Sequence, residues 1–284
     1  MGISYPLHKK TLTFIKKHEP KGLLLTGKGF EKASTTKKTI HTLKTMKPNY
    51  SPLIAIDQEG GRVVRIKKGV SQFPSFLKIA ESNSSNYAEK LAYNRGKELK
   101  ELGIDMILGP VLDVNTIKTN PVIGDRSFGP DPNVVSTLGR ATIRGLKRAG
   151  LIPVAKHFPG HGHTKKDSHK ALPIVTLSKA DLRTLHISPF ADAIYEGLPA
   201  IMTSHVIYTQ FDTTKPASLS PIIIKDLLRK ELQFKGLIIT DDLKMKAINH
   251  NLSIKKAVKE SLQAGANLVI VIGSLKDYES LVDL

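Results

Sequence analysis

The polar residues of this sequence that could do chemistry gather in five short blocks, and each block follows a run of apolar residues. The blocks are 57–62, 113–115, 156–163, 204–205 and 241–242. Three of them contain carboxylates and two contain histidine, the side chains that exchange protons and bind polar substrates near neutral pH. Capping explains a single aspartate at a strand end, whereas five blocks together indicate a ligand-binding pocket.

Two other chemistries are suggested by individual motifs and are not favoured. Asp167, Ser168 and His169 are consecutive, whereas the members of a serine hydrolase triad come from distant chain positions, and no Gly-x-Ser-x-Gly elbow occurs. His161 and His163 flank a glycine and could chelate a metal, but no His-x-His motif follows the first strand, as it does in amidohydrolase-like barrels. We therefore expect no metal and no other cofactor, and a metal site is the minor alternative.

The elements that must position these blocks alternate along the chain. Short, almost continuous apolar runs, typical of strands covered on both faces, alternate with longer segments of helical period. The predicted strands are 22–26, 53–57, 107–114, 153–157, 200–205, 237–240 and 268–272. Residues 2–6 could supply the missing first strand, and we expect its helix to be absent or vestigial. The pattern predicts an α/β fold, a TIM-like (β/α)8 barrel with a reduced first strand, whose C-terminal face carries the polar blocks.

Two helices have clear boundary signals. Asp131 followed by Pro132 is typical of an N-cap and a first helical residue, and Gly150 stands where a left-handed C-terminal residue belongs. Ser220 and Pro221 start a second helix in the same way. Both helices fit the outer layer of a barrel.

Composition sets the limits of this interpretation. The chain has 284 residues, 40% of them hydrophobic, without repeat or composition break, so we expect one domain over residues 1–284.

No run of about 18 apolar residues and no signal-peptide pattern occurs, which favours a cytoplasmic protein without a membrane span; export after removal of a leader is the alternative. The absence of cysteine excludes disulfides and thiolate sites. The net charge of +18 lies in scattered lysine pairs and only 6% of residues are aromatic, which argues against a nucleic-acid binder and leaves attraction to an anionic polymer as an alternative.

Four blocks resemble the bacterial β-N-acetylglucosaminidases of glycoside hydrolase family 3. They are IDQEGGRVVR at 56–65, GDRSF at 124–128, KHFPGHG at 156–162 followed by DSH at 167–169, and TDDLKM at 240–245. The third block is the most specific of the four. The resemblance runs from about residue 22 to the end of the chain. It implies a retaining glycosidase that releases terminal β-linked N-acetylglucosamine, with a saccharide or muropeptide from peptidoglycan turnover as substrate; it implies nothing about the oligomeric state.

The resemblance also implies the catalytic residues. Asp241 matches the nucleophile, the carboxylate that captures the anomeric carbon in a glycosyl-enzyme. Asp242 is the alternative, because neighbouring side chains on a strand point to opposite faces and cannot both reach one atom. His169 matches the general acid/base and Asp167 its partner; the i, i+2 spacing lets the carboxylate orient the imidazole and stabilise its protonated form. The structural alternative is a capping aspartate followed by an exposed histidine.

The resemblance assigns five further residues to the sugar pocket: Asp57, Arg65, Arg126, Lys156 and His157. The aspartate can accept hydrogen bonds from sugar hydroxyls, while the cations donate to hydroxyl and amide oxygens. For Arg65 a surface ion pair is the alternative.

We also expect His205 and Met245 to line this pocket. Two alternative functions stay open, namely a family 3 β-glycosidase or glycoside phosphorylase of other specificity, and a weakly active muropeptide-binding protein.

Overall fold

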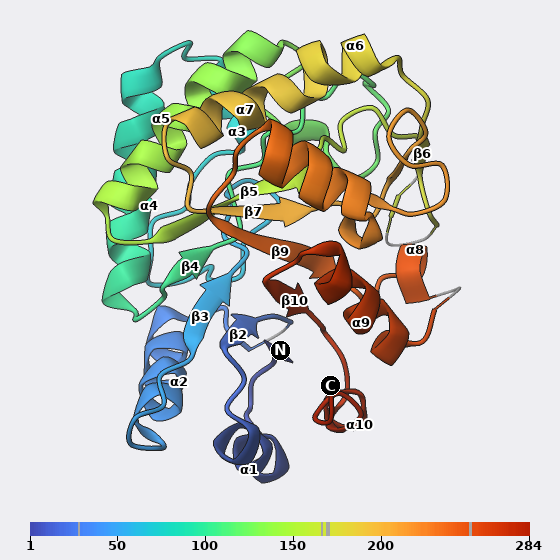
Figure 1. Ribbon diagram of the computed structural model, residues 1–284. Helices are drawn as coiled ribbons and strands as arrows, with labels where there is room; N and C mark the ends of the chain where they lie inside the picture. The colour runs from blue at the N-terminus through green and yellow to red at the C-terminus, as the bar shows by residue number, and fades with distance from the viewer. Residues whose placement is uncertain (28, 166, 169–170, 250–251) are drawn as a thin grey trace.

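Eight parallel strands form the centre of the computed structural model, which describes residues 1–27, 29–165, 167–168, 171–249 and 252–284 (Figure 1). Neighbouring strands in the sheet follow one another in the sequence, which is the order of a TIM-like barrel. In that order the strands are β1 (Gly2–Ile3), β2 (Gly22–Leu25), β3 (Leu53–Ile56), β4 (Met106–Ile107), β5 (Ile152–Phe158), β7 (Ala200–Thr203), β9 (Leu237–Asp242) and β10 (Leu268–Ile270). A separate two-stranded sheet pairs β6 (Ile174–Val175) with β8 (Ile207–Tyr208). The predicted fold class is confirmed.

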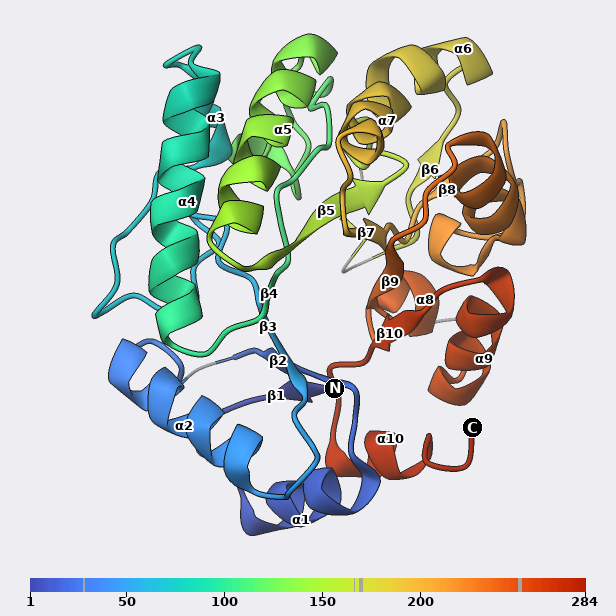
Figure 2. The same ribbon diagram turned by 60° about the vertical axis from the view of Figure 1, so that its left-hand side comes forward.

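Helices surround the strands on the outside, as Figure 2 shows in a view down the barrel. The longer ones are α1 (Lys9–His18), α2 (Ala33–Thr45), α4 (Ser85–Glu101), α5 (Pro132–Arg148), α7 (Ser188–Tyr195) and α9 (Ile254–Ala264). Short helices are α3 (Phe76–Ala80), α6 (Lys179–Asp181), α8 (Lys246–Asn249) and α10 (Leu275–Glu279), with single 3₁₀ turns at η1 (Gly124–Arg126) and η3 (Ala217–Leu219). Two segments are π-helical, η2 (Leu182–Ile187) and η4 (Ile222–Glu231). None of the described helices is both long and apolar enough to cross a membrane.

The barrel closes through the short first strand. The backbone N–H of Gly2 donates to the carbonyl oxygen of Val271, just beyond β10, at 2.9 Å. The predicted reduction of this strand is confirmed, but the expected loss of its helix is wrong, because α1 is ten residues long. Helix α1 was not recognised in the sequence because it is rich in lysine and buries only one side chain fully, that of Ile15.

The element boundaries follow backbone chemistry. Strand β4 ends at Ile107, earlier than predicted, since Pro110 has no N–H to continue the ladder. Helix α5 begins as predicted, with the Asp131 carboxylate accepting from Asn133 N at 2.8 Å, and Gly150 after its end has φ +82°.

Two apolar layers hold the strands in place. Inside the barrel, Leu24, Met106, Leu108, Val154 and Met202 pack against one another. A larger cluster between strands and helices contains six buried aromatic rings, those of Phe76, Phe128, Phe158, Phe190, Tyr208 and Phe234. Because all strands are parallel, their C-terminal ends lie at one face, where the polar blocks meet.

Candidate active site

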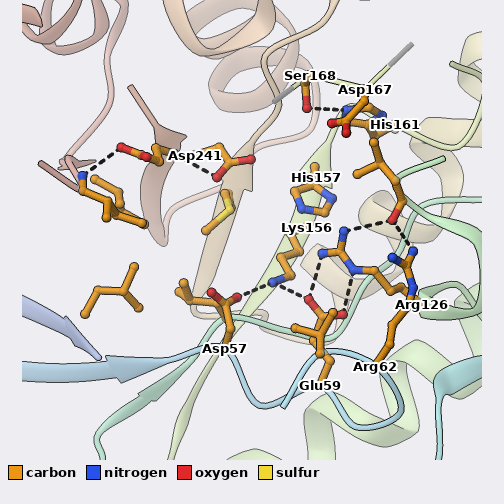
Figure 3. Close-up of a pocket in the computed structure, with 18 of the residues that line it drawn as sticks. Asp57, Glu59, Arg62, Arg126, Lys156, His157, His161, Asp167, Ser168 and Asp241 are labelled. Carbon is orange, nitrogen blue, oxygen red and sulfur yellow. Dashed lines mark hydrogen bonds and ion pairs between the residues drawn. The ribbon is translucent and has the colours of Figure 1, made fainter. Parts of the chain in front are cut away.

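The C-terminal ends of β3, β5 and β9 surround a cavity of about 320 Å³ (Figure 3). Seven of the predicted site residues line it, namely Asp57, Arg65, Arg126, Lys156, His157, Asp167 and Asp241. The eighth, His169, lies outside the described residues. His205 and Met245 are buried but do not line the cavity, so that expectation is wrong.

A network of buried charges forms one wall of the cavity. Lys156 Nζ lies 2.8 Å from Asp57 Oδ1 and 2.7 Å from Glu59 Oε1 (Figure 3). The Arg126 guanidinium binds both oxygens of Glu59, at 2.8 and 2.9 Å, and Arg65 Nη2 lies 3.5 Å from Asp57 Oδ2. The three cations exceed the two carboxylates by one charge, so the wall favours ligand groups that accept hydrogen bonds.

Glu59 is the centre of this network. Its burial would raise the pKa of the carboxyl, but the charges of Arg126 and Lys156 outweigh that effect and hold the pKa well below its usual range. Burial likewise opposes the charge of Lys156, yet Asp57 and Glu59 raise the pKa of its ammonium. Glu59 and Lys156 are therefore ionised at neutral pH, and each depends on its partners because a buried charge without one is strongly destabilising.

A second carboxylate, Asp113, lies behind His157. It is fully buried and its Oδ2 lies 2.7 Å from His157 Nδ1. Its oxygens also accept from the backbone N–H groups of His157, at 3.1 and 3.2 Å, and of His161, at 2.6 Å. Asp113 thus holds both the backbone and the ring of His157.

The loop that carries Asp167 is held to the barrel through Ser168. The Ser168 hydroxyl lies 3.0 Å from His161 Nε2 (Figure 3). The backbone carbonyl of Ser168 accepts from Ala247 N at 3.3 Å. Burial lowers the pKa of His161 to about 4, so its ring is neutral at pH 7. Since Thr164 Oγ1 donates to the His161 carbonyl, it accepts from Nδ1, which leaves Nε2 to accept from Ser168.

The adjacent carboxylates on β9 have different surroundings. Asp241 Oδ1 accepts from the N–H of Asp242 at 2.8 Å; burial opposes its charge, but His205, His157 and this hydrogen bond lower its pKa. Asp242 Oδ1 accepts from Lys244 N and Ile272 N, which ties the ends of β9 and β10 together. Burial raises the pKa of Asp242 to about 6. Both side chains border the cavity, and Asp241 is the more readily ionised.

The two histidines that we weighed as metal ligands have other partners. His161 bonds to Thr164 and Ser168, and His163 Nδ1 lies 2.7 Å from Thr116 Oγ1. Among the described residues, no group of three or more His, Cys, Asp and Glu side chains is placed to hold a metal ion.

Comparison with known families gives a match over almost the whole chain. Residues 3–284 match the family model described as the glycosyl hydrolase family 3 N terminal domain. The chain belongs to glycosyl hydrolase family 3. A β-hexosaminidase from Nitrosomonas eutropha is 36% identical to this family 3 chain over 288 residues, 99% of this chain and 78% of the relative. A β-hexosaminidase from Neisseria meningitidis serogroup B is 37% identical over 257 residues, 88% of this chain and 70% of the relative.

Solved structures of family 3 proteins superpose closely on this barrel. The family 3 β-N-acetylglucosaminidase from Paenibacillus sp. str. FPU-7 matches with a TM-score of 0.96 and 34% identity, over 99% of this chain and 55% of its own. NagZ from Neisseria gonorrhoeae, in complex with N-trifluoroacetyl-D-glucosamine, matches with a TM-score of 0.90 and 32% identity, over 99% and 83%. The chain thus spans little more than half of the Paenibacillus enzyme.

Sequence reasoning missed four residues of this family 3 site: Glu59, Asp113, His161 and Ser168. Glu59 could have been found, since it stands two positions after Asp57 and such residues share one side of an extended chain. Asp113 gave a signal as well, as the aspartate of the polar block at 113–115. His161 and Ser168 belong to the KHFPGHG and DSH motifs, but nothing in the sequence indicated their contact, because it depends on how the loop folds back.

Proposed function

We propose that this chain hydrolyses terminal β-linked N-acetylglucosamine with retention of configuration. The family supports a glycosidase, and relatives named β-hexosaminidase and β-N-acetylglucosaminidase support the sugar. The observation that carries the proposal is the ionised Asp241 at the end of β9, facing a cavity with a cationic wall. A carboxylate so placed can attack an anomeric carbon.

In this proposal the charged wall of the cavity binds the sugar. Asp57 accepts hydrogen bonds from sugar hydroxyls, while Lys156 and Arg126 donate to oxygen atoms of the sugar or its N-acetyl group. Arg65 also lines the cavity and adds a third cation to this wall. The ion pairs hold these side chains in position before the sugar arrives, which lowers the entropy lost on binding.

The proposed reaction is a double displacement. An Asp241 oxygen forms a bond to the anomeric carbon as the bond to the leaving oxygen breaks, and that oxygen takes a proton from protonated His169. Neutral His169 then takes a proton from water, whose oxygen attacks the anomeric carbon and releases Asp241 as a carboxylate. Asp167 stabilises the charged imidazole in the first step.

The natural substrate class in this proposal is peptidoglycan turnover fragments. Their carboxylates suit a protein with a net charge of +18. We further propose that residues 1–284 act as one domain and that the protein works in the cytoplasm. Fractionation of the source cells tests the location.

An aryl N-acetyl-β-D-glucosaminide tests the activity, with proton NMR of the anomer formed first. We expect release of β-N-acetylglucosamine. An initial α product would show inversion, a sugar phosphate formed on addition of inorganic phosphate would show a phosphorylase, and binding of muropeptides without turnover would show a binding protein. Release of N-acetylglucosamine from a purified muropeptide tests the substrate class.

A further inference from the structure

Asp113 has no role in the proposed reaction, yet it is the most completely enclosed carboxylate at the site. It is fully buried and does not line the cavity, but two of the residues that do, His157 and His161, bond to it. Four hydrogen-bond contacts, all from histidines, fill its two oxygens. A buried group engaged to this degree holds its partners in one arrangement.

These contacts determine which nitrogen of His157 carries a proton. The backbone N–H groups of His157 and His161 can only donate, so Asp113 is held as an acceptor. Interaction with the two histidines also keeps the pKa of Asp113 low in spite of its burial. A carboxylate has no proton to donate, and His157 Nδ1 at 2.7 Å must therefore be the donor.

The other ring nitrogen, Nε2, bonds to no described residue, and the His157 ring lines the cavity (Figure 3). In a neutral ring with the proton on Nδ1, Nε2 is an acceptor. Lys156, Arg126 and Arg65 only donate, so a singly protonated His157 ring gives the wall an acceptor at Nε2 in addition to the carboxylate of Asp57.

We propose that Asp113 is a positioning residue that fixes His157 as its Nδ1–H tautomer, and that His157 Nε2 thereby selects substrates with a hydroxyl donor at the facing position. The proposal rests on the sugar substrate proposed above. A substrate without that hydroxyl leaves the nitrogen buried without a partner, and sites built to hydrogen-bond a hydroxyl reject such analogues.

The tautomer is measured directly by ¹⁵N NMR of histidine-labelled wild-type protein, with His157→Gln to assign the signal. We expect Nδ1 protonated and Nε2 unprotonated near pH 7. A proton on Nε2, in either the other tautomer or a doubly protonated ring, overturns the proposal. This measurement needs no activity, so it decides the tautomer even if the protein fails to hydrolyse N-acetylglucosaminides and the proposed function is wrong.

Asp113→Asn tests the consequence. The amide oxygen still accepts from the two backbone N–H groups, while its NH₂ faces His157 Nδ1 and moves the ring proton to Nε2. We expect kcat/KM for the parent aryl substrate to fall about ten- to a hundredfold, the loss that follows when a buried hydrogen bond to the substrate cannot form.

A series of monodeoxy substrates separates selection from general damage. In wild type, one deoxy position should lower kcat/KM about ten- to a hundredfold, the cost of a buried acceptor left without its partner, and in Asp113→Asn the same position should lower it less than about threefold. Asp105→Asn is the matched control. This half-buried carboxylate lies directly before β4, whereas Asp113 lies after β4 at the face of the barrel that carries the site. Like Asp113, Asp105 accepts from a backbone N–H group, that of Ile54. It should keep the wild-type deoxy pattern. An unchanged pattern in Asp113→Asn overturns the selection by His157.

Discussion

At the scale of single residues, the neighbouring carboxyl groups of Asp241 and Asp242 on β9 differ in pKa. The pKa of Asp241 is lowered in spite of its burial, with help from the N–H of Asp242 and the charge of Lys156, whereas burial raises the pKa of Asp242 to about 6. A nucleophile must be ionised, so the electrostatics favour Asp241 for that part.

Exchange of each carboxylate for an amide separates the two. Asp241→Asn should lower kcat at least about a thousandfold, because the amide cannot form the glycosyl-enzyme. Asp242→Asn should stay within about tenfold of wild type, since the amide oxygen still accepts from Lys244 N and Ile272 N. Mass spectrometry after inactivation with a fluorosugar should label Asp241, and a label on Asp242 would reverse the assignment.

His169 has its own kinetic signature if it is the acid/base. His169→Ala should harm substrates with poor leaving groups most, because an acidic phenol needs little protonation to depart. With an activated aryl substrate the second step then limits turnover, and azide, which needs no general base, should restore it. Asp167→Ala should act in the same direction but less severely. Equal losses for all leaving groups without rescue by azide would show that the acid lies elsewhere.

The site was predictable from sequence where a residue belongs to a motif and hidden where its partner is distant. Lys156 and Asp57 stand 99 residues apart, yet each ends an apolar run and could be placed at the same face. Glu59 and Asp113 belong to the site through contacts with Lys156 and His157, which lie far away in the sequence and are brought near by the fold. The sequence showed that both residues are polar but did not show these partners.

At the scale of elements, the first strand is short and is held by a side chain from the other end of the chain. The Tyr278 hydroxyl, from α10, donates to the Gly2 carbonyl at 2.8 Å and accepts from Gly273 N at 2.9 Å. Seven strands were predictable because each lies in a run of apolar residues. The first strand and α1 were harder to recognise. Strand β1 has only two residues, and α1 has a single fully buried side chain, so neither gives a periodic apolar pattern.

Tyr278→Phe removes both hydrogen bonds and leaves the buried carbonyl of Gly2 and the partly buried N–H of Gly273 without this partner. We expect the free energy of unfolding to fall by about 1–3 kcal/mol, the range for a buried polar group left unsatisfied. Denaturant unfolding followed by circular dichroism measures the change. Tyr195→Phe is the matched control, because its side chain is 92% exposed, and it should leave stability unaltered. Equal stability of both variants would mean that α10 does not hold the first strand.

At the scale of the whole molecule, buried histidines should limit stability in acid. Burial lowers the pKa of His161 and of His186 to about 4, whereas in the unfolded chain both titrate near 6.5. The pKa is lower in the folded state, so the stabilisation is complete above pH 6.5 and is lost as the pH falls toward 4. Each ring can contribute up to about 3 kcal/mol to this loss.

His186→Leu should reduce the loss of stability between pH 6.5 and 4. Neither ring nitrogen of His186 has a hydrogen-bond partner among the described residues, so an apolar side chain of similar volume gives up no bond found there. Unfolding by urea at pH 7 and pH 5 measures the effect. His41→Leu, at an exposed position of α2, should keep the wild-type pH dependence. The same pH dependence in His186→Leu would show that His161 or the carboxylates dominate.

The contact that joins Gly2 to α10 spans 276 residues, and this separation governs the order of events as the chain is made. Strand β1 can pair with β2 early, but its other edge has no partner until β10 has left the ribosome. Throughout synthesis the growing sheet therefore presents open strand edges, the surfaces on which chains associate wrongly. Contacts between residues so far apart in sequence also form slowly. The closing of the barrel is thus a late step, and at two residues β1 leaves only a short edge exposed while it waits.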